Sequence, residues 1–152
     1  MKLNGEYTFD GPRQEVWKIL RDPDLLILAL PGTKSLKQIG ENEYEGELQV
    51  RIGPITGSFG GKLTVSNEQL HESLTLTVEG TGKIGFVKGS GDVVFIDQGD
   101  VKTTIKYSGE IQIGGRVASV GQRLFDTVSK SMIDQGLNKL NIILQERVAA
   151  QK

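Results

Sequence analysis

Alternating, glycine-rich stretches fill most of this 152-residue chain, and one long stretch with little glycine closes it. Apolar residues recur at every second position in residues 44–52 and 55–65, a pattern that predicts strands with one dry and one wet face. Glycine inside a strand weakens pairing, so its frequency here indicates strands that bend sharply. A sheet that bends this much is expected to wrap around another element.

The closing stretch predicts that element. From about residue 118 to 148 apolar side chains follow helical spacing, with charged residues mostly on the opposite side. Residues 13–20 and 24–30 predict two shorter helical segments, separated by Asp22-Pro23 and ended by Pro31-Gly32. This order predicts an α+β helix-grip fold, a curved antiparallel sheet of six or seven strands around a long C-terminal helix, in a single domain over residues 1–152.

Charge and composition exclude several classes of function. Lysine and arginine number 18 and aspartate and glutamate 19, which leaves no basic face for nucleic acid. The chain has no cysteine and one histidine, so disulfides and thiolate metal sites are excluded, and neither a metal nor a cofactor is expected. The first residues have no apolar signal segment, and no window is apolar enough for a membrane span. We expect a cytoplasmic protein.

Three local patterns look functional, and each has a structural interpretation that we prefer. Residues 80–85 satisfy GxGxxG, but a strand follows where a nucleotide site needs a helix, so we predict a bent hairpin. His71 has no second histidine or cysteine to share a metal. Asp22 and Asp24 flank Pro23, where aspartates usually form caps and turns.

The inward-facing residues are compatible with a packed core or with a partly open cavity. Many facing positions are glycine, Met132 is a flexible gap filler, and Tyr107 offers a polar group on an apolar face, which together favour a cavity. The segment 25–30 is too apolar for an exposed helix, so it is either buried or a lid that faces a membrane or partner. The predicted ligand-binding residues are Trp17, Leu26, Leu28, Leu30, Val50, Ile52, Phe59, Leu76, Phe86, Val93, Phe95, Ile105, Tyr107, Leu124, Val128 and Met132.

Several blocks of the sequence resemble the G-subunit family of carbon monoxide dehydrogenase. They are Trp17 with Asp22-Pro23, the Leu-Pro-Gly at 30–32, IGPITGSFGG at 52–61, the glycines at 85–91 and GGRVASVGQRL at 114–124. The resemblance implies the START-like (SRPBCC) helix-grip superfamily, whose members commonly enclose a hydrophobic cavity. It also implies a non-catalytic role beside an aerobic molybdenum-dependent CO dehydrogenase, helping to couple that enzyme to the membrane, with a lipophilic quinone as a candidate cargo.

We therefore expect a protein that binds a hydrophobic small molecule, quinone- or lipid-like, and that is not an enzyme. Two alternatives stay open: a cavity enzyme, cyclase or hydrolase, that uses Tyr107, and an adaptor without ligand that docks a redox enzyme. Peripheral contact with the inner face of the membrane is a further open point. Arg116 and Arg123 either pair with acidic neighbours or meet an anionic head group or a partner enzyme.

Overall fold

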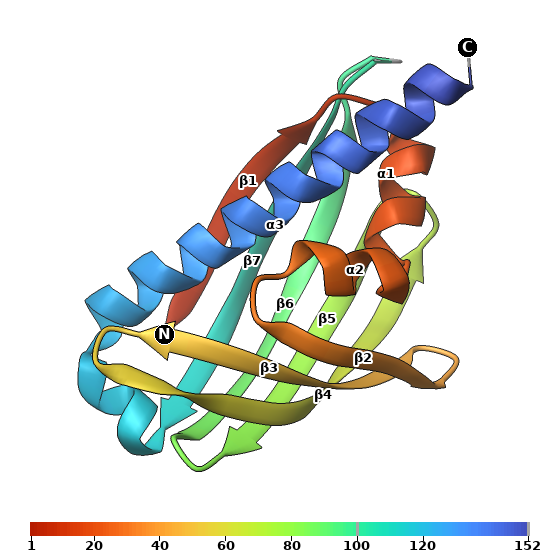
Figure 1. The fold of residues 1–152 in the computed structure, drawn as a ribbon. Coiled ribbons are helices and arrows are strands. Elements are labelled where there is room, and N and C mark those ends of the chain that lie inside the picture. The colour runs from red at the N-terminus through yellow and green to blue at the C-terminus, as the bar shows by residue number, and fades with distance from the viewer. Residues whose placement is uncertain (100, 152) are drawn as a thin grey trace.

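The computed structural model describes residues 1–99 and 101–151, and it has the predicted helix-grip fold. Within these residues seven strands form one antiparallel sheet in the order β1-β7-β6-β5-β4-β3-β2, and Figure 1 shows helix α3 lying across one face of it, with α1 and α2 beside α3. We call this the concave face. The elements are β1 (Lys2–Phe9), α1 (Arg13–Leu20), α2 (Pro23–Ala29), β2 (Thr33–Gly40), β3 (Glu43–Ile52), β4 (Ile55–Gln69), β5 (Ser73–Gly82), β6 (Gly85–Asp97), β7 (Thr103–Gly114), the 3-10 helix η1 (Gly115–Val120) and α3 (Gln122–Ala150).

Glycines that face each other across neighbouring strands let the sheet bend. Gly61 pairs with Gly46 on one side and with Gly80 on the other. A Cβ atom added to Gly61 would lie 2.9 Å from the Cα of Gly80, which is closer than real Cβ atoms come. Gly109 approaches Gly91 in the same way, at 2.8 Å from Cβ to Cα. Only glycine permits these strands to approach so closely.

The long C-terminal helix begins later than the sequence predicts. Residues 115–120 form η1, and α3 starts at Gln122 rather than near residue 118. The break falls at Gly121, whose φ of +89° is incompatible with a continuing helix. η1 is nevertheless part of the core, because Val117 is fully buried and its backbone N–H donates to the carbonyl oxygen of Ile84 at 2.7 Å.

The core consists of two clusters that lie towards opposite ends of the concave face. The first cluster lies under α1 and the second half of α3 and includes Phe9, Trp17, Phe95 and Leu144. The second lies near the start of α3 and is made of Val50, Ile52, Ile55, Phe59, Ile84, Val117 and Phe125. Half-buried apolar side chains pack against each of the two clusters.

Candidate functional site

A cavity of about 430 Å³ lies between α3 and the side of the sheet that carries β3, and it is widely open to solvent. Its volume lies in the range of small-molecule sites, which is about 300–1,000 Å³. Val50 of β3 and Val128 and Met132 of α3 supply the apolar lining. The other lining residues are Pro31, Gly32, Gln49, Arg51, Thr127, Ser131 and Gln135.

The sequence of α3 separates an apolar wall from a polar mouth. Val128 and Met132 are four residues apart, so they lie on one face of the helix, and both are half-buried. Thr127, Ser131 and Gln135 form the neighbouring column, and all three are exposed. The amide nitrogen of Gln135 lies 3.2 Å from the hydroxyl oxygen of Ser131 and donates to it.

Two glycines place the loop after α2 at this mouth. Gly32 has a φ of +84°, and a Cβ atom there would collide with the carbonyl oxygen of Gln49. The backbone N–H of Gln49 in turn donates to the carbonyl oxygen of Gly32 at 2.8 Å, which fixes the loop against β3. On α3, buried Gly136 lets the end of α2 approach, because an added Cβ would lie 3.3 Å from Cδ2 of Leu30.

The middle of the concave face carries apolar surface that is partly open to solvent. Val78 belongs to β5, the fourth of the seven strands, and its neighbours across the sheet are Leu63 and Gly89. It shares the inward face with Leu74, which is buried, yet 37% of Val78 is exposed. Its neighbour Gly89 has no side chain to fill the space. Helix α3 therefore does not fill the concave face.

The structure brings some of the predicted ligand-binding residues together and separates others. Val50, Val128 and Met132 line the cavity. Others are closed into the core: Trp17, Val93, Phe95 and Ile105 in the first cluster, and Ile52 and Phe59 in the second. Leu26, Leu76, Tyr107 and Leu124 are half-buried beside these clusters. Leu28 and Leu30 are exposed, 68% and 38% respectively.

Phe86 does not face the cavity. Strand alternation puts it on the face of β6 opposite to Val93 and Phe95, and it is 38% exposed. Its ring lies over Gly114, whose added Cβ would meet the ring carbons. The prediction that Phe86 faces the cavity is wrong, because the hairpin fixes the opposite phase of alternation.

Tyr107 is on the concave face but leans away from the cavity. Its ring lies over Gly5 of β1, where an added Cβ would be 2.7 Å from Cζ. Because β1 is on the far side of β7 from β3, the hydroxyl group points away from Val50. Burial raises the pKa of Tyr107, and the negative charges of Asp134 and Asp126 raise it further, so the phenol keeps its proton at neutral pH.

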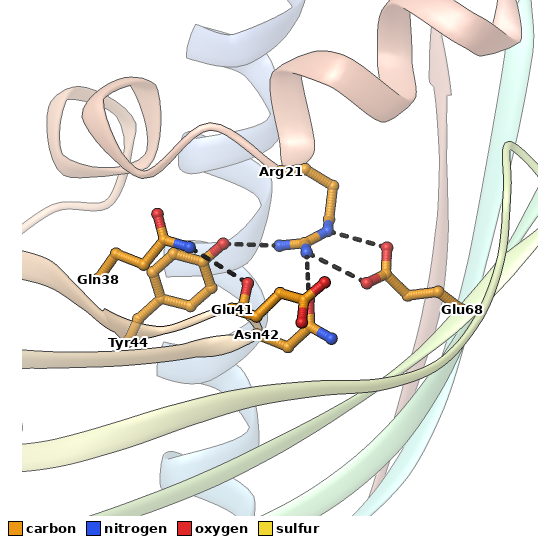
Figure 2. A network of polar contacts seen from close by, with 6 residues as sticks. All are labelled: Arg21, Gln38, Glu41, Asn42, Tyr44 and Glu68. Atoms are coloured by element: carbon orange, nitrogen blue, oxygen red, sulfur yellow. Dashed lines mark hydrogen bonds and ion pairs between the residues drawn. The ribbon is translucent and has the colours of Figure 1, made fainter.

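Sequence reasoning missed a cluster around Arg21, which Figure 2 shows from close by. The guanidinium group donates to the hydroxyl of Tyr44 at 2.9 Å and to Oδ1 of Asn42 at 3.0 Å, and it forms an ion pair with Glu68. Burial would lower the pKa of Arg21, but the hydrogen bonds to Glu68 and Tyr44 outweigh it and raise that pKa. No sequence motif marks this cluster, because its members are 21 to 47 positions from Arg21.

The structure places the three local patterns of the sequence: GxGxxG at residues 80–85, the aspartates around Pro23, and His71. Residues 80–85 form the β5–β6 hairpin, in which Gly82 pairs with Gly85. Asp22 caps α2, since its Oδ1 accepts from the backbone N–H of Asp24 at 3.0 Å. His71 is half-buried with its ring edge-on to Trp17, 6.0 Å between centroids, and it lines a second, more polar cavity of about 220 Å³.

Within residues 1–99 and 101–151, no group of three or more histidine, aspartate or glutamate side chains is placed to hold a metal ion. Over the same residues, every helix is too short or too polar to cross a membrane.

Comparison with known proteins supports this description of the fold. A conserved protein from Geobacillus kaustophilus has a solved structure with a TM-score of 0.92 and 31% identity, over 96% of each chain. A START superfamily protein from Mycobacterium smegmatis matches with a TM-score of 0.71 at 8% identity, over 95% of this chain and 97% of that one. The Zhui aromatase/cyclase from a Streptomyces species matches at 0.73 and 14%, over 97% and 95%; these last two likenesses show the fold alone.

The search of curated proteins gives no match. The family model for the G subunit of carbon monoxide dehydrogenase (CoxG) matches residues 5–144, which is most of the chain. With the START-like helix-grip fold described above, this match shows that the chain belongs to the CoxG family, the G-subunit family of carbon monoxide dehydrogenase.

Proposed function

We propose that this chain binds a hydrophobic small molecule, of quinone or lipid type, in the cavity between α3 and β3, and does no covalent chemistry on it. The observation that carries the proposal is the apolar wall of Val50, Val128 and Met132 inside a mouth of polar residues. Burying apolar ligand surface against such a wall stabilises the complex by about 25 cal/mol per Å². The partly exposed surface around Val78 offers additional apolar area beyond that wall.

The second part of the proposal concerns partners. The name of the family supports a role beside a CO-dehydrogenase-type molybdenum enzyme. Leu28 and Leu30 are exposed on the segment that ends at the cavity mouth, which supports peripheral contact with a membrane from which a lipophile could be taken up. In this proposal the protein carries the lipophile and the partner enzyme does the chemistry.

The first test is to purify the protein without denaturation, extract it with organic solvent and identify by mass spectrometry what is released. A stoichiometric lipophile supports the proposal and names its class. The second test fills the cavity with Met132→Trp and measures the affinity for decylubiquinone and dodecanol by titration calorimetry. The matched control is Ile142→Trp, because Ile142 lies on the same helix but is 56% exposed and outside the cavity.

Met132→Trp is expected to weaken binding of both probes by at least about tenfold, which corresponds to about 1.4 kcal/mol, while Ile142→Trp leaves it unchanged. Equal affinities of Met132→Trp and the unchanged protein would rule out this cavity as the binding site. If neither probe binds and extraction releases nothing, the proposal of a lipophile carrier is wrong, and the adaptor alternative takes its place.

A further inference from the structure

The charge at the mouth of the cavity is of one sign. Among the ten residues in the described part of the chain that line the cavity, Arg51 is the only charged one. It lies near the end of β3 and is exposed, and strand alternation starts its side chain on the face opposite to Val50 and Ile52. It still lines the cavity, because the pairing of β2 with β3 ends at Leu48 and leaves this edge of β3 open for a long side chain to reach round. Across residues 1–99 and 101–151 no carboxylate forms a salt bridge with Arg51. Its guanidinium group therefore has hydrogen-bond donors available to a ligand.

A second arginine extends the polar column of α3 towards the same end of the mouth. Arg123 lies one helical turn before Thr127, in the column that continues through Ser131. Its neighbour Leu124 packs against the turn that follows β3, since a Cβ atom added to Gly53 would lie 2.8 Å from Cδ2 of Leu124. Arg51 is only two residues before that turn. Both arginines thus lie at the end of the mouth where β3 meets the start of α3.

Two carboxylates of α3 lie close to these polar groups but do not line the cavity. Asp126 is three residues after Arg123 and pairs with Lys130 at 3.4 Å, and Asp134 is three residues after Ser131. Both also raise the pKa of Tyr107, which leans towards β1. Among the residues that line the cavity, the charge that a ligand meets is therefore the positive charge of Arg51.

The mouth also offers a neutral donor. The hydroxyl oxygen of Ser131 already accepts a hydrogen bond from Gln135, so the hydroxyl hydrogen is free to donate to a ligand. Donors at the mouth and an apolar wall within match a molecule with an acceptor at one end and a hydrocarbon chain at the other. We infer that the cavity takes a single-chain amphiphile with an anionic head, such as a long-chain carboxylate, whose chain lies on Val128 and Met132 and whose head lies at Arg51 and Arg123.

This inference rests on the proposed function, and its test separates the two. Titration calorimetry at neutral pH compares dodecanoate with dodecanol, which share a chain length and differ in the charge of the head. The variants are Arg51→Gln, Arg123→Gln and, as a matched control, Lys88→Gln, which removes a cation from the exposed face of β6. All four proteins are first compared by thermal unfolding.

The unchanged protein is expected to bind dodecanoate more tightly than dodecanol. Arg51→Gln is expected to lower the dodecanoate affinity about fivefold, the upper range for an exposed ion pair, and Arg123→Gln by a smaller factor. Dodecanol affinity stays constant in all variants, and Lys88→Gln changes neither. Equal binding of the two probes, or an Arg51→Gln variant with full dodecanoate affinity, would overturn the anionic head while leaving the cavity as a lipophile site. Failure of both probes to bind would overturn the proposed function and this inference with it.

Discussion

Arg21 and Glu68 face each other in a two-point ion pair, with Nε 3.2 Å from Oε2 and Nη2 3.2 Å from Oε1. Arg21 is the C-cap residue that directly follows α1, and Glu68 lies near the end of β4. The cluster around this pair ties the two short helices to the sheet (Figure 2). Since α2 begins two residues after Arg21, the pair also fixes the segment that leads to the cavity mouth.

Replacing Arg21 is expected to lower the free energy of unfolding by about 2 kcal/mol. Arg21→Met leaves Glu68, Tyr44 and Asn42 without their partner in a half-buried place, and hydrogen bonds to charged groups contribute about 1.5–3 kcal/mol each before relaxation. Arg21→Lys is expected to restore little, because an ammonium group cannot serve three acceptors through a planar fork. Urea unfolding of the three proteins measures this. A lysine variant as stable as the unchanged protein would show that only the charge matters.

Two adjacent glycines of β4 are expected to respond in opposite ways to replacement by alanine. A Cβ atom at Gly61 would lie 2.9 Å from the Cα of Gly80, whereas one at Gly60 would meet nothing within 4 Å. Gly61→Ala is expected to cost about 1–3 kcal/mol of stability through overpacking against the neighbouring strand. Gly60→Ala is expected to leave stability unchanged or raise it by up to about 1 kcal/mol, because alanine restricts the unfolded chain. Equal losses in thermal unfolding would contradict the close approach of β4 and β5.

The fold could be predicted from the sequence because its signals are periodic and local. Alternation in residues 44–52 and 55–65 gave the correct inward faces, on which Tyr44, Val50, Phe59 and Val65 are buried. Helical periodicity found α3 but not its first residue. The 3-10 helix before α3 buries Val117 as well as an α-helix would, so the apolar pattern does not mark where one helix ends and the next begins. Only the φ of Gly121 shows the break.

The site could be predicted only in part, because lining a cavity and belonging to a core give the same sequence pattern. Val50 and Ile52 are alternate residues of β3 and both are buried, yet only Val50 lines the cavity. The difference depends on where α3 crosses the sheet, and α3 is far from β3 along the chain. Arg21 was missed for the same reason, since its partners are distant in sequence.

In the apolar segment 25–30, before the cavity mouth, some side chains pack in the core and others are exposed. Two of its leucines are therefore expected to respond differently to substitution. Leu26 packs against the first cluster, whereas Leu28 is 68% exposed. Leu26→Ser is expected to cost about 2 kcal/mol of stability, and Leu28→Ser less than about 0.5 kcal/mol, as measured by urea unfolding.

Leu28→Ser is nevertheless expected to reduce sedimentation with phosphatidylglycerol vesicles, if this surface contacts a membrane as proposed. Leu70→Ser is the matched control, because Leu70 is 67% exposed on the turn between β4 and β5. Vesicle binding that is equal in both variants would leave α2 without a special role in membrane contact.

Tyr107 gives a prediction for alkaline pH. Burial, Asp134 and Asp126 raise its pKa in the folded protein above the ordinary value of 10.0. Its contribution to stability is therefore complete below about pH 10, and it is lost as the pH rises through the higher folded-state pKa, since the unfolded chain ionises first. The melting temperature of the unchanged protein should fall more steeply above about pH 10 than that of Tyr107→Phe, which has no proton to lose there.

The same variant bears on the alternative of a cavity enzyme. Because the Tyr107 hydroxyl lies over Gly5 and points away from Val50, Tyr107→Phe is expected to bind decylubiquinone and dodecanol as tightly as the unchanged protein does. If the melting temperatures of the unchanged protein and Tyr107→Phe fall equally across the alkaline range, the Tyr107 hydroxyl is not buried as described above. A large loss of ligand affinity would place the hydroxyl in the binding site, and it would return Tyr107 to the centre of an enzymatic hypothesis.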